Sequence, residues 1–235
     1  MNLPDGDEVH LWKIDHSTVT TPFPVLYALL STEEKSRAQR FVFDRHRHAF
    51  VINRAALKTV LARYCPDAPQ PGAIVFTQNE YGKPALPDQS QLQFNISHSA
   101  DKALVAVSGH EPVGVDCEKV DEDKTCLPIA MSQFSSAEYE HLVRLPPDER
   151  AGVFFQYWAR REATMKASGM GFSLNIRAFR YDQDEAFINN GCELVIPELG
   201  NTAIVIKDCQ SFSGFRASVA RVRRLGAVTC FSLNF

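Results

Sequence analysis

Arg161-Glu162-Ala163-Thr164-Met165-Lys166 has a counterpart in the first half of the chain, Arg54-Ala55-Ala56-Leu57-Lys58. Each segment follows a helix-start signal, a serine three residues before a glutamate, at residues 31–34 and 135–138. Each also precedes stretches that resemble strands. We interpret this repetition as duplication of an α+β unit. A chance likeness between two short helical segments is the alternative.

The spacing of apolar residues predicts helices at 31–41, 44–63 and 153–168 and another from residue 134 onward. Strands are expected at residues 9–14, 74–77, 94–96, 103–108, 113–118, 179–181, 192–196, 203–207 and 217–222. Gly169 and Gly171 can adopt the left-handed conformation that ends a helix. We therefore expect an α+β fold, a pseudo-twofold duplication of two similar halves at residues 1–112 and 113–235. The active site would lie in the cleft between them.

Composition and charge narrow the class of protein. The chain has 235 residues, of which 45% are hydrophobic and 23% are charged, as in ordinary globular proteins. Its net charge of -3 argues against a general attraction to nucleic acid. The six cysteines form no C-x-x-C pair, which favours structural thiols in a reducing cytoplasm over a zinc site. We expect neither a signal peptide in residues 1–15 nor a membrane-spanning segment.

Val113-Gly114-Val115-Asp116-Cys117-Glu118 predicts a strand in which alternate side chains share a face. The apolar residues would face the core, and Asp116 and Glu118 would lie together on the opposite face beside Gly114. Two neighbouring carboxylates repel each other unless a cation neutralises them. Their hard oxygen atoms suit Mg²⁺, which typically combines protein carboxylates with phosphate oxygens. The alternative is an acidic strand end that faces solvent.

A second group of side chains suited to catalysis lies in the expected helix at 153–168. Trp158, Glu162 and Lys166 are four residues apart, so they share one helix face. The tryptophan indicates that this face is at least partly buried, and a partly buried carboxylate and ammonium need polar partners. A metal ion and phosphate would supply them. A surface Glu–Lys pair is the alternative.

Two shorter motifs carry groups of the kind that bind phosphate. Phe94-Asn95-Ile96-Ser97-His98-Ser99 places hydroxyls, an amide and an imidazole at a strand end. Ser97 and His98 would point to opposite faces, which disfavours a nucleophile–base pair. They could instead donate to a common anion, or His98 could be structural. In Gly82-Lys83-Pro84 the glycine permits close backbone approach and the lysine adds a charge suited to phosphate, although such turns are common.

Basic residues are concentrated between positions 35 and 58. They are Lys35, Arg37, Arg40, Arg45, Arg47, Arg54 and Lys58. A solvated helix face is the simplest interpretation. Contact with nucleic acid is an alternative, although no recognised nucleic-acid-binding motif accompanies these residues. A phosphate-rich small ligand or an acidic protein partner fits equally well.

Together these motifs resemble those of the 4'-phosphopantetheinyl transferase superfamily, in particular its two-domain branch that serves peptide, polyketide and siderophore synthetases. The order is Tyr81 to Pro84, Phe94 to Ser99, Val113 to Glu118 and Trp158 to Lys166, and it covers most of the chain. The resemblance implies transfer of the 4'-phosphopantetheine arm of coenzyme A to a serine of an apo acyl- or peptidyl-carrier protein. Adenosine 3',5'-bisphosphate would leave. Coenzyme A and Mg²⁺ would occupy the cleft between the halves.

The resemblance also implies roles for individual residues. The metal, Mg²⁺ with Mn²⁺ as an alternative, would be bound by Asp116, Glu118 and Glu162. Coenzyme A would be bound by Arg47, Gly82, Lys83, Pro84, Ser97, His98, Asp116, Glu162 and Lys166. The 3'-phosphate would lie near Arg47, with Arg37 and Arg54 as further candidates. The catalytic pair would be Glu162, as the base for the carrier serine, and Lys166, beside the diphosphate.

One position departs from the family pattern. Arg161 stands where the family usually has lysine, and arginine keeps the charge but is not readily deprotonated. Pairing with phosphate or a carboxylate is the role open to it. Glu34 stands where relatives can carry a base, which would rearrange the 3'-phosphate contacts.

These inferences lead to an expected cytoplasmic, monomeric enzyme whose partners are coenzyme A and carrier proteins, without nucleic-acid or membrane partners. Two rival classes stay open. One is a catalytically silent module that binds coenzyme A or a carrier protein. The other is a nucleic-acid binder that uses residues 35–58, which would show salt-sensitive binding to oligonucleotides.

Overall fold

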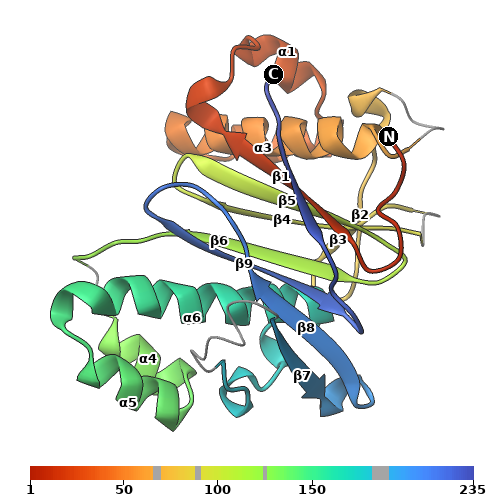
Figure 1. The fold of residues 1–235 in the computed structure, drawn as a ribbon. Helices are drawn as coiled ribbons and strands as arrows, with labels where there is room; N and C mark the ends of the chain where they lie inside the picture. Colours follow the sequence, from red (N-terminus) through yellow and green to blue (C-terminus); the bar gives the residue numbers. More distant parts are fainter. Residues whose placement is uncertain (66–69, 88–90, 124–125, 182–190) are drawn as a thin grey trace.

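The computed structural model describes residues 1–65, 70–87, 91–123, 126–181 and 191–235, and it stacks helix, sheet, sheet and helix in layers (Figure 1). In the described chain the first sheet has the order β10-β1-β5-β4 and the second the order β6-β9-β8-β7. The first comprises β1 (Val9–Asp15), β4 (Leu92–Ser99), β5 (Lys102–Gly109) and β10 (Val228–Ser232). The second comprises β6 (Val113–Lys119), β7 (Cys192–Ile196), β8 (Thr202–Asp208) and β9 (Phe215–Val222). The expected α+β class is confirmed.

Helix α3 (Asp44–Ala62) covers the outer face of the first sheet. Its buried residues Leu57 and Val60 belong to one apolar cluster with Trp12 and Val105 of the sheet. Helices α1 (Phe23–Ala28) and α2 (Thr32–Gln39) pack beside α3 and share a smaller cluster with it. The first sheet is therefore shielded from water on this side by helices from its own half of the chain.

The two sheets pack face to face through a common apolar layer. Leu11 and Leu104 from the first sheet meet Val115, Cys117 and Val219 from the second, and all five side chains are fully buried. The apolar face predicted for residues 113–118 is therefore correct. The intervening residues of β6 point the other way, toward α6.

Helix α6 (Pro147–Ser168) covers the outer face of the second sheet, with α4 (Leu127–Gln133) and α5 (Ser136–Arg144) beyond it (Figure 1). Ala163 and Ala167 lie in one cluster with Ile204 and Ala220 of the sheet. The helix ends as expected at Gly169, whose φ of 71° is left-handed and whose N–H donates to the Met165 carbonyl at 3.2 Å. None of the described helices combines the length and apolarity needed to cross a bilayer.

The last strand of the described chain returns to the first sheet. β10 runs parallel to β1, with Leu11 opposite Cys230, while the other described strand pairs of the two sheets are antiparallel. Both chain ends lie on the α3 side of the molecule (Figure 1). The segment assigned to the second half thus contributes an edge strand to the first sheet.

Two of the expected strands are wrong. In residues 74–77, only Thr77 joins a strand, the short β2 (Thr77–Gln78), which pairs with β3 (Pro84–Ala85). Residues 179–181 are irregular, although Phe179 and Tyr181 are buried in the core beneath α6. Ile74, Phe179 and Tyr181 fill the core from loops, and the local pattern of apolar residues cannot distinguish such a loop from a strand.

The two halves repeat one local device. Ser31 and Glu34 form a capping box at the start of α2, and Ser135 and Glu138 form another at the start of α5. In each case the glutamate pairs with a cation of the long helix of its own half. The pairs are Glu34 with Arg54 at 3.4 Å and Lys58 at 2.8 Å, and Glu138 with Arg161. This repetition favours the duplication, which stays a prediction.

Candidate functional site

A pocket of about 260 Å³ lies where the β2–β3 turn, β4 and the C-terminal part of α6 meet. It is lined by Tyr81, Gly82, Lys83, Pro84, Asn95, Ile96, Glu162, Met165, Lys166, Gly169 and Gly171. Three of the sequence motifs, far apart along the chain, therefore line one pocket. Asp116 of β6 adjoins it through its bond to Lys166.

Asp116 is almost completely buried, with 2% of its surface exposed. Its Oδ1 accepts hydrogen bonds from Lys166 Nζ at 2.6 Å and from Ser97 Oγ at 2.8 Å. Its Oδ2 is buried and has no hydrogen-bond partner among the described residues. A buried carboxylate oxygen without a donor is costly, so it is suited to bind a cation.

Glu118 and Glu162 extend this acidic group. Glu118 Oε2 accepts a hydrogen bond from Ser99 Oγ at 2.9 Å. Burial raises the pKa of Glu162, and the charges of Asp116 and Glu118 raise it further against the opposing effect of Lys166. Among the described residues, no three acidic, histidine or cysteine side chains are grouped into a ready-made metal site. The three carboxylates thus share one electrostatic environment without forming a closed ligand cage.

Glu162 and Lys166 occupy the expected face of α6. Trp158 packs partly buried against the core of the second sheet, and the Lys166 side chain is 27% exposed. The predicted partial burial of this stripe is confirmed. Gly114 of β6 allows the close approach of strand and helix, because a Cβ there would lie 2.1 Å from the Ala163 carbonyl oxygen.

Lys83 connects the β2–β3 turn to the C-terminal end of α6 by hydrogen bonds. Its Nζ donates to the carbonyls of Lys166 at 2.6 Å and Val113 at 3.0 Å, and Asn79 Nδ2 donates to the carbonyl of Gly169 at 3.1 Å. Burial lowers the pKa of Lys83 to about 8. The structure therefore places this ammonium at the pocket wall, engaged by backbone carbonyls.

Ser97 and His98 face opposite sides of β4, as the strand geometry predicts. Ser97 is buried and also binds Lys166 Nζ at 3.1 Å. His98 is exposed, and its pKa is lowered by partial desolvation and by the charges of Lys166 and His16. Ser97 is thus joined to the carboxylate group, and His98 lies on the other face of the strand.

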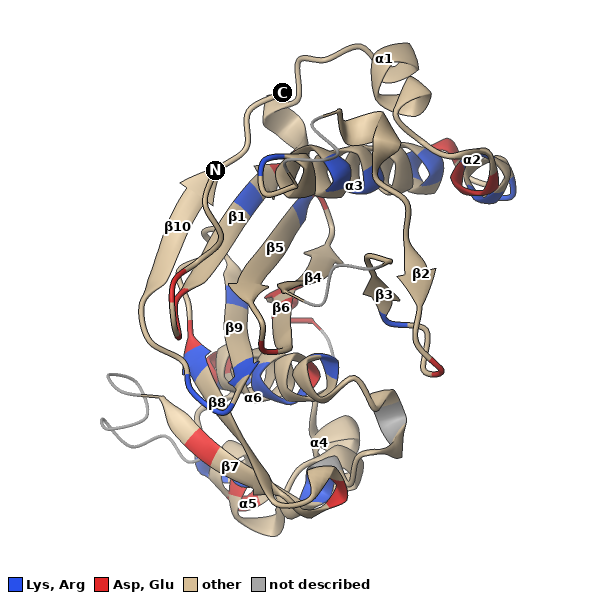
Figure 2. Ribbon diagram, turned by 90° about the vertical axis from the view of Figure 1, so that its right-hand side faces the viewer, with Lys and Arg blue, Asp and Glu red and all other residues tan. Residues whose placement is uncertain are grey.

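The arginines of the basic stretch separate into two groups. Arg47 pairs with Asp44 at 2.5 Å in the first turn of α3 and is not among the residues that line the pocket at Glu162. Arg37, Arg40 and Arg54 line a neighbouring pocket of about 400 Å³. Pro84 lines both pockets, so the basic one adjoins the pocket at Glu162. Figure 2 shows Lys and Arg along α2 and α3 on one side and along α6 on the other.

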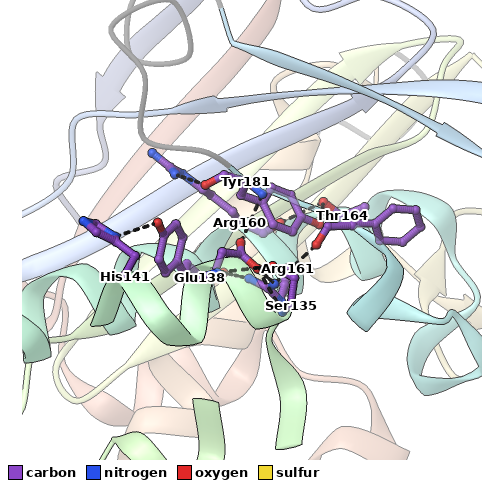
Figure 3. Close-up of polar contacts among 9 residues, drawn as sticks. Ser135, Glu138, His141, Arg160, Arg161, Thr164 and Tyr181 are labelled. Atoms are coloured by element: carbon purple, nitrogen blue, oxygen red, sulfur yellow. Dashed lines mark hydrogen bonds and ion pairs between the residues drawn. The ribbon is translucent and has the colours of Figure 1, made fainter. Parts of the chain in front are cut away.

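Arg161 points away from the pocket into the second half. Its side chain is 1% exposed, its Nη2 pairs with Glu138, and its guanidinium lies over the rings of Phe134 at 4.2 Å and Tyr181 at 4.9 Å. Figure 3 shows this group, with the Arg161–Glu138 pair beside the Ser135 cap. Pairing with a carboxylate, one of the two roles expected for Arg161, is therefore correct.

Sequence reasoning did not foresee the contacts of two residues in the motifs it had identified: Glu138 pairs with Arg161, and the Ser99 hydroxyl donates to Glu118. Glu138 carried a signal, because a serine followed three residues later by glutamate is typical of a capping box. Ser99 carried none beyond its place in the strand motif, because its contact with Glu118 depends on how two sheets meet.

Comparison with known proteins gives consistent matches. Residues 16–110 match the family model described as 4'-phosphopantetheinyl transferase, N-terminal, and residues 112–191 match that of the 4'-phosphopantetheinyl transferase superfamily. The chain is similar to the 4'-phosphopantetheinyl transferase HetI of Nostoc sp., with 38% identity over 72% of this chain and 71% of that protein.

Two relatives from Bacillus subtilis are also similar. The 4'-phosphopantetheinyl transferase Sfp is 32% identical over 67% of this chain and 69% of its own length. The 4'-phosphopantetheinyl transferase ffp is 29% identical over 84% of both chains. The similarity thus reaches across both sheets.

Proposed function

The chain belongs to the 4'-phosphopantetheinyl transferase superfamily, and we propose that the pocket beside Glu162 and Lys166 is the place where it binds coenzyme A. Enzymes of this superfamily use coenzyme A as donor and act on carrier proteins. The chain transfers the 4'-phosphopantetheine arm to a carrier serine. The serine oxygen attacks the β-phosphorus, the bond to the bridging oxygen breaks, and adenosine 3',5'-bisphosphate leaves with that oxygen.

We propose Asp116, Glu118 and Glu162 as the ligands of Mg²⁺, with Mn²⁺ as a substitute. The single observation that carries this assignment is the buried Asp116 Oδ2, which no described residue bonds. The raised pKa of Glu162, caused in part by the charges of Asp116 and Glu118, adds to it, since a shared cation would offset the repulsion that these charges exert on Glu162. A bound Mg²⁺ would offset charge on the diphosphate and on the leaving group.

The residues of the chain supply the remaining chemistry. Lys166, which donates to Asp116, would contact the diphosphate and stabilise the charge that develops there. Glu162 is the candidate base for the serine proton, and its raised pKa makes it a stronger base than an ordinary glutamate. Positioning and charge stabilisation are the main demands of phosphoryl transfer.

Binding of the rest of coenzyme A is assigned to the first half. Gly82, Lys83, Pro84, Ser97 and His98 are proposed as the contacts that the superfamily motifs imply. For the 3'-phosphate, the pocket lined by Arg37, Arg40 and Arg54 is a stronger candidate than Arg47, since it adjoins the coenzyme A pocket through Pro84.

We further propose a cytoplasmic monomer that binds neither nucleic acid nor membrane. A duplicated chain, divided near residue 112, forms its cleft without a second subunit. The rival interpretation, a catalytically silent binding module, rested on Arg161. The Arg161 guanidinium pairs with Glu138 in the core of the second half and does not line the pocket. The unusual arginine therefore gives no support to a silent module.

The test is transfer of labelled coenzyme A to an apo carrier protein by wild type, Asp116→Ala and Glu162→Ala. We expect both variants to lose transfer. Glu140→Ala, which removes an exposed carboxylate that pairs with Arg144, is the matched control and should transfer at the wild-type rate. Robust transfer by both site variants would refute the metal assignment, and no transfer by wild type across a panel of carriers would refute the function.

A further inference from the structure

The edges of the two sheets meet along β4 and β6, which are not neighbours in either sheet of the described chain. Side chains of β4 replace the missing backbone ladder by accepting hydrogen bonds from alternate amides of β6. The amides of Val115, Cys117 and Lys119 donate to Asn95 Oδ1, Ser97 Oγ and Ser99 Oγ at 2.9, 3.3 and 3.1 Å. We call these three contacts the β4–β6 seam.

The two serines of the seam make a second bond. Ser97 Oγ donates to Asp116 Oδ1 at 2.8 Å, and Ser99 Oγ donates to Glu118 Oε2 at 2.9 Å. The Ser97 hydroxyl thus bonds both the Asp116 carboxylate and the backbone amide of the next residue, Cys117. The Ser99 hydroxyl does the same for Glu118 and Lys119. The same arrangement occurs twice, two residues apart along both strands.

The chemistry of a hydroxyl makes this arrangement directional. A serine hydroxyl has one proton to donate and lone pairs with which to accept. Because a β6 amide donates to the serine oxygen, the hydroxyl proton is directed to the carboxylate. One oxygen of each carboxylate is thereby held, and for Asp116 the other is the buried Oδ2, which has no hydrogen-bond partner among the described residues.

We propose that Ser99 is a positioning residue that orients Glu118 for the divalent metal, as Ser97 does for Asp116. The inference rests on the proposed metal-binding function of these carboxylates. Partners of metal ligands set the orientation of the ligands and tune affinity without touching the ion. Ser99 acts in this way through its bond to Glu118 and its anchorage to the backbone of Lys119.

The third contact of the seam provides an internal contrast. Asn95 accepts from the amide of Val115, and the preceding residue is Gly114, which has no carboxylate to orient. The β4 residue is a serine where the residue before the donating β6 backbone amide is an aspartate or a glutamate. It is an asparagine where that preceding residue is Gly114. Asn95 therefore serves as the reference for the mechanical role of the seam in measurements made without coenzyme A, whose proposed pocket it also lines.

The test measures Mn²⁺ binding by electron paramagnetic resonance, with coenzyme A present, for wild type, Ser99→Ala and Ser99→Thr. We expect Ser99→Ala to weaken Mn²⁺ binding by roughly tenfold or more, since loss of an outer partner of a metal ligand has effects of this size. Ser99→Thr keeps the hydroxyl and should restore binding. The Mg²⁺ concentration that gives half-maximal transfer should rise in parallel.

A double-mutant cycle with Glu118→Gln shows whether Ser99 acts through Glu118. If it does, Ser99→Ala has little further effect on Mn²⁺ binding once Glu118 is changed. Asn95→Ala is the reference for loss of a seam contact. Because Asn95 also lines the proposed coenzyme A pocket, both variants are compared without coenzyme A, and the Mn²⁺ affinity of Asn95→Ala should fall less than that of Ser99→Ala. Equal losses of affinity, or full additivity in the cycle, would overturn the inference.

Failure of the proposed function has a different signature. If wild type binds Mn²⁺ no better than Asp116→Ala, the metal site itself is refuted and the role of Ser99 with it. If wild type binds and Asp116→Ala does not, but Ser99→Ala matches wild type, only the role of Ser99 is refuted. Should Ser99→Ala fail to fold, Ser99→Cys, of similar size and with a weaker donor, takes its place.

Discussion

Arg161 is a charged residue whose side chain is buried in the core of the second half. It pairs with Glu138, and the aromatic rings of Phe134 and Tyr181 lie against its guanidinium. A lysine at this position could pair with Glu138 but would not offer a planar surface to two rings. The departure from the usual family residue thus has a structural role away from the pocket.

Arg161→Ala should lower the free energy of unfolding by about 3–5 kcal/mol, because removal of one partner of a buried ion pair leaves the other charge uncompensated. Urea denaturation followed by circular dichroism measures the loss. Arg144→Ala, which breaks an exposed pair with Glu140, is the matched control and should cost at most about 1 kcal/mol. Equal effects of the two changes would show that the buried pair adds nothing.

Lys83 makes stability depend on pH in an unusual direction. Its pKa falls from 10.5 to about 8 on folding because burial disfavours the charged form. Between these values the unfolded chain binds more protons than the folded one, so stability rises with pH. Relative to Lys83→Met, wild type should gain up to about 1.4 kcal/mol per pH unit between pH 8 and 10.

Denaturation at several pH values tests this effect of Lys83. Lys119→Met, which removes an exposed lysine, is the control and should leave the pH dependence of wild type unchanged. A constant difference between wild type and Lys83→Met across this pH range would contradict the lowered pKa.

At the scale of elements, β6 lies directly on the backbone of α6. A Cβ at Gly114 would lie 2.1 Å from the carbonyl oxygen of Ala163 and 2.4 Å from the amide nitrogen of Ala167. Gly114→Ala should therefore separate the strand from the helix and cost about 3 kcal/mol, the upper part of the usual range for overpacking. It should also reduce transfer, since Asp116 would move away from Lys166.

Gly72→Ala is the matched control for Gly114→Ala. A Cβ at Gly72 meets no atom within 4 Å, and the backbone there is not left-handed. Thermal unfolding and the transfer assay should show a wild-type Tm and rate for Gly72→Ala. A Gly114→Ala variant with the Tm of wild type would refute the close contact of strand and helix.

The sequence predicts a strand correctly where alternate side chains are buried and the backbone is also hydrogen-bonded to a neighbouring strand. Residues 113–118 alternate because one face packs between the sheets and the other faces α6, and the prediction is correct. In residues 74–77 and 179–181, loops bury Ile74, Phe179 and Tyr181, and the strands predicted for both stretches are wrong. β10 was missed because a short edge strand that pairs across most of the chain has only a weak local pattern.

For the candidate site, the sequence predicts the participants better than their contacts. Glu162 and Lys166 share a helix face, and their motif meets the Tyr81 to Pro84 turn at one pocket. The contact of Lys83 with backbone carbonyls and the bond between Ser99 and Glu118 were not foreseen. Such contacts depend on how separate sheets meet, which local periodicity does not specify.

At the scale of the whole molecule, the halves share an apolar layer and β10, so they should unfold together. The two tryptophans report on different sheets, since Trp12 lies in the first and Trp158 packs against the second. Single-tryptophan variants, Trp12→Phe and Trp158→Phe, should therefore show the same urea midpoint by fluorescence.

Leu233→Ala adds a perturbation at one end of the chain. Leu233 is 2% exposed in the core of the first sheet, so the change should cost about 2–5 kcal/mol. Made in each single-tryptophan variant, it should lower both midpoints equally if the molecule unfolds as one unit. A shift confined to the Trp12 signal would show two independent units.

The return of β10 to the first sheet has a consequence for biosynthesis. β1 (Val9–Asp15) is made long before its parallel neighbour β10 (Val228–Ser232). At roughly 5–20 residues per second, that edge of β1 waits about 10–40 s for its partner. A nascent chain in this state exposes unpaired backbone to other chains. Chaperones that bind the emerging polypeptide before β10 is made should therefore raise the final yield of native protein the most.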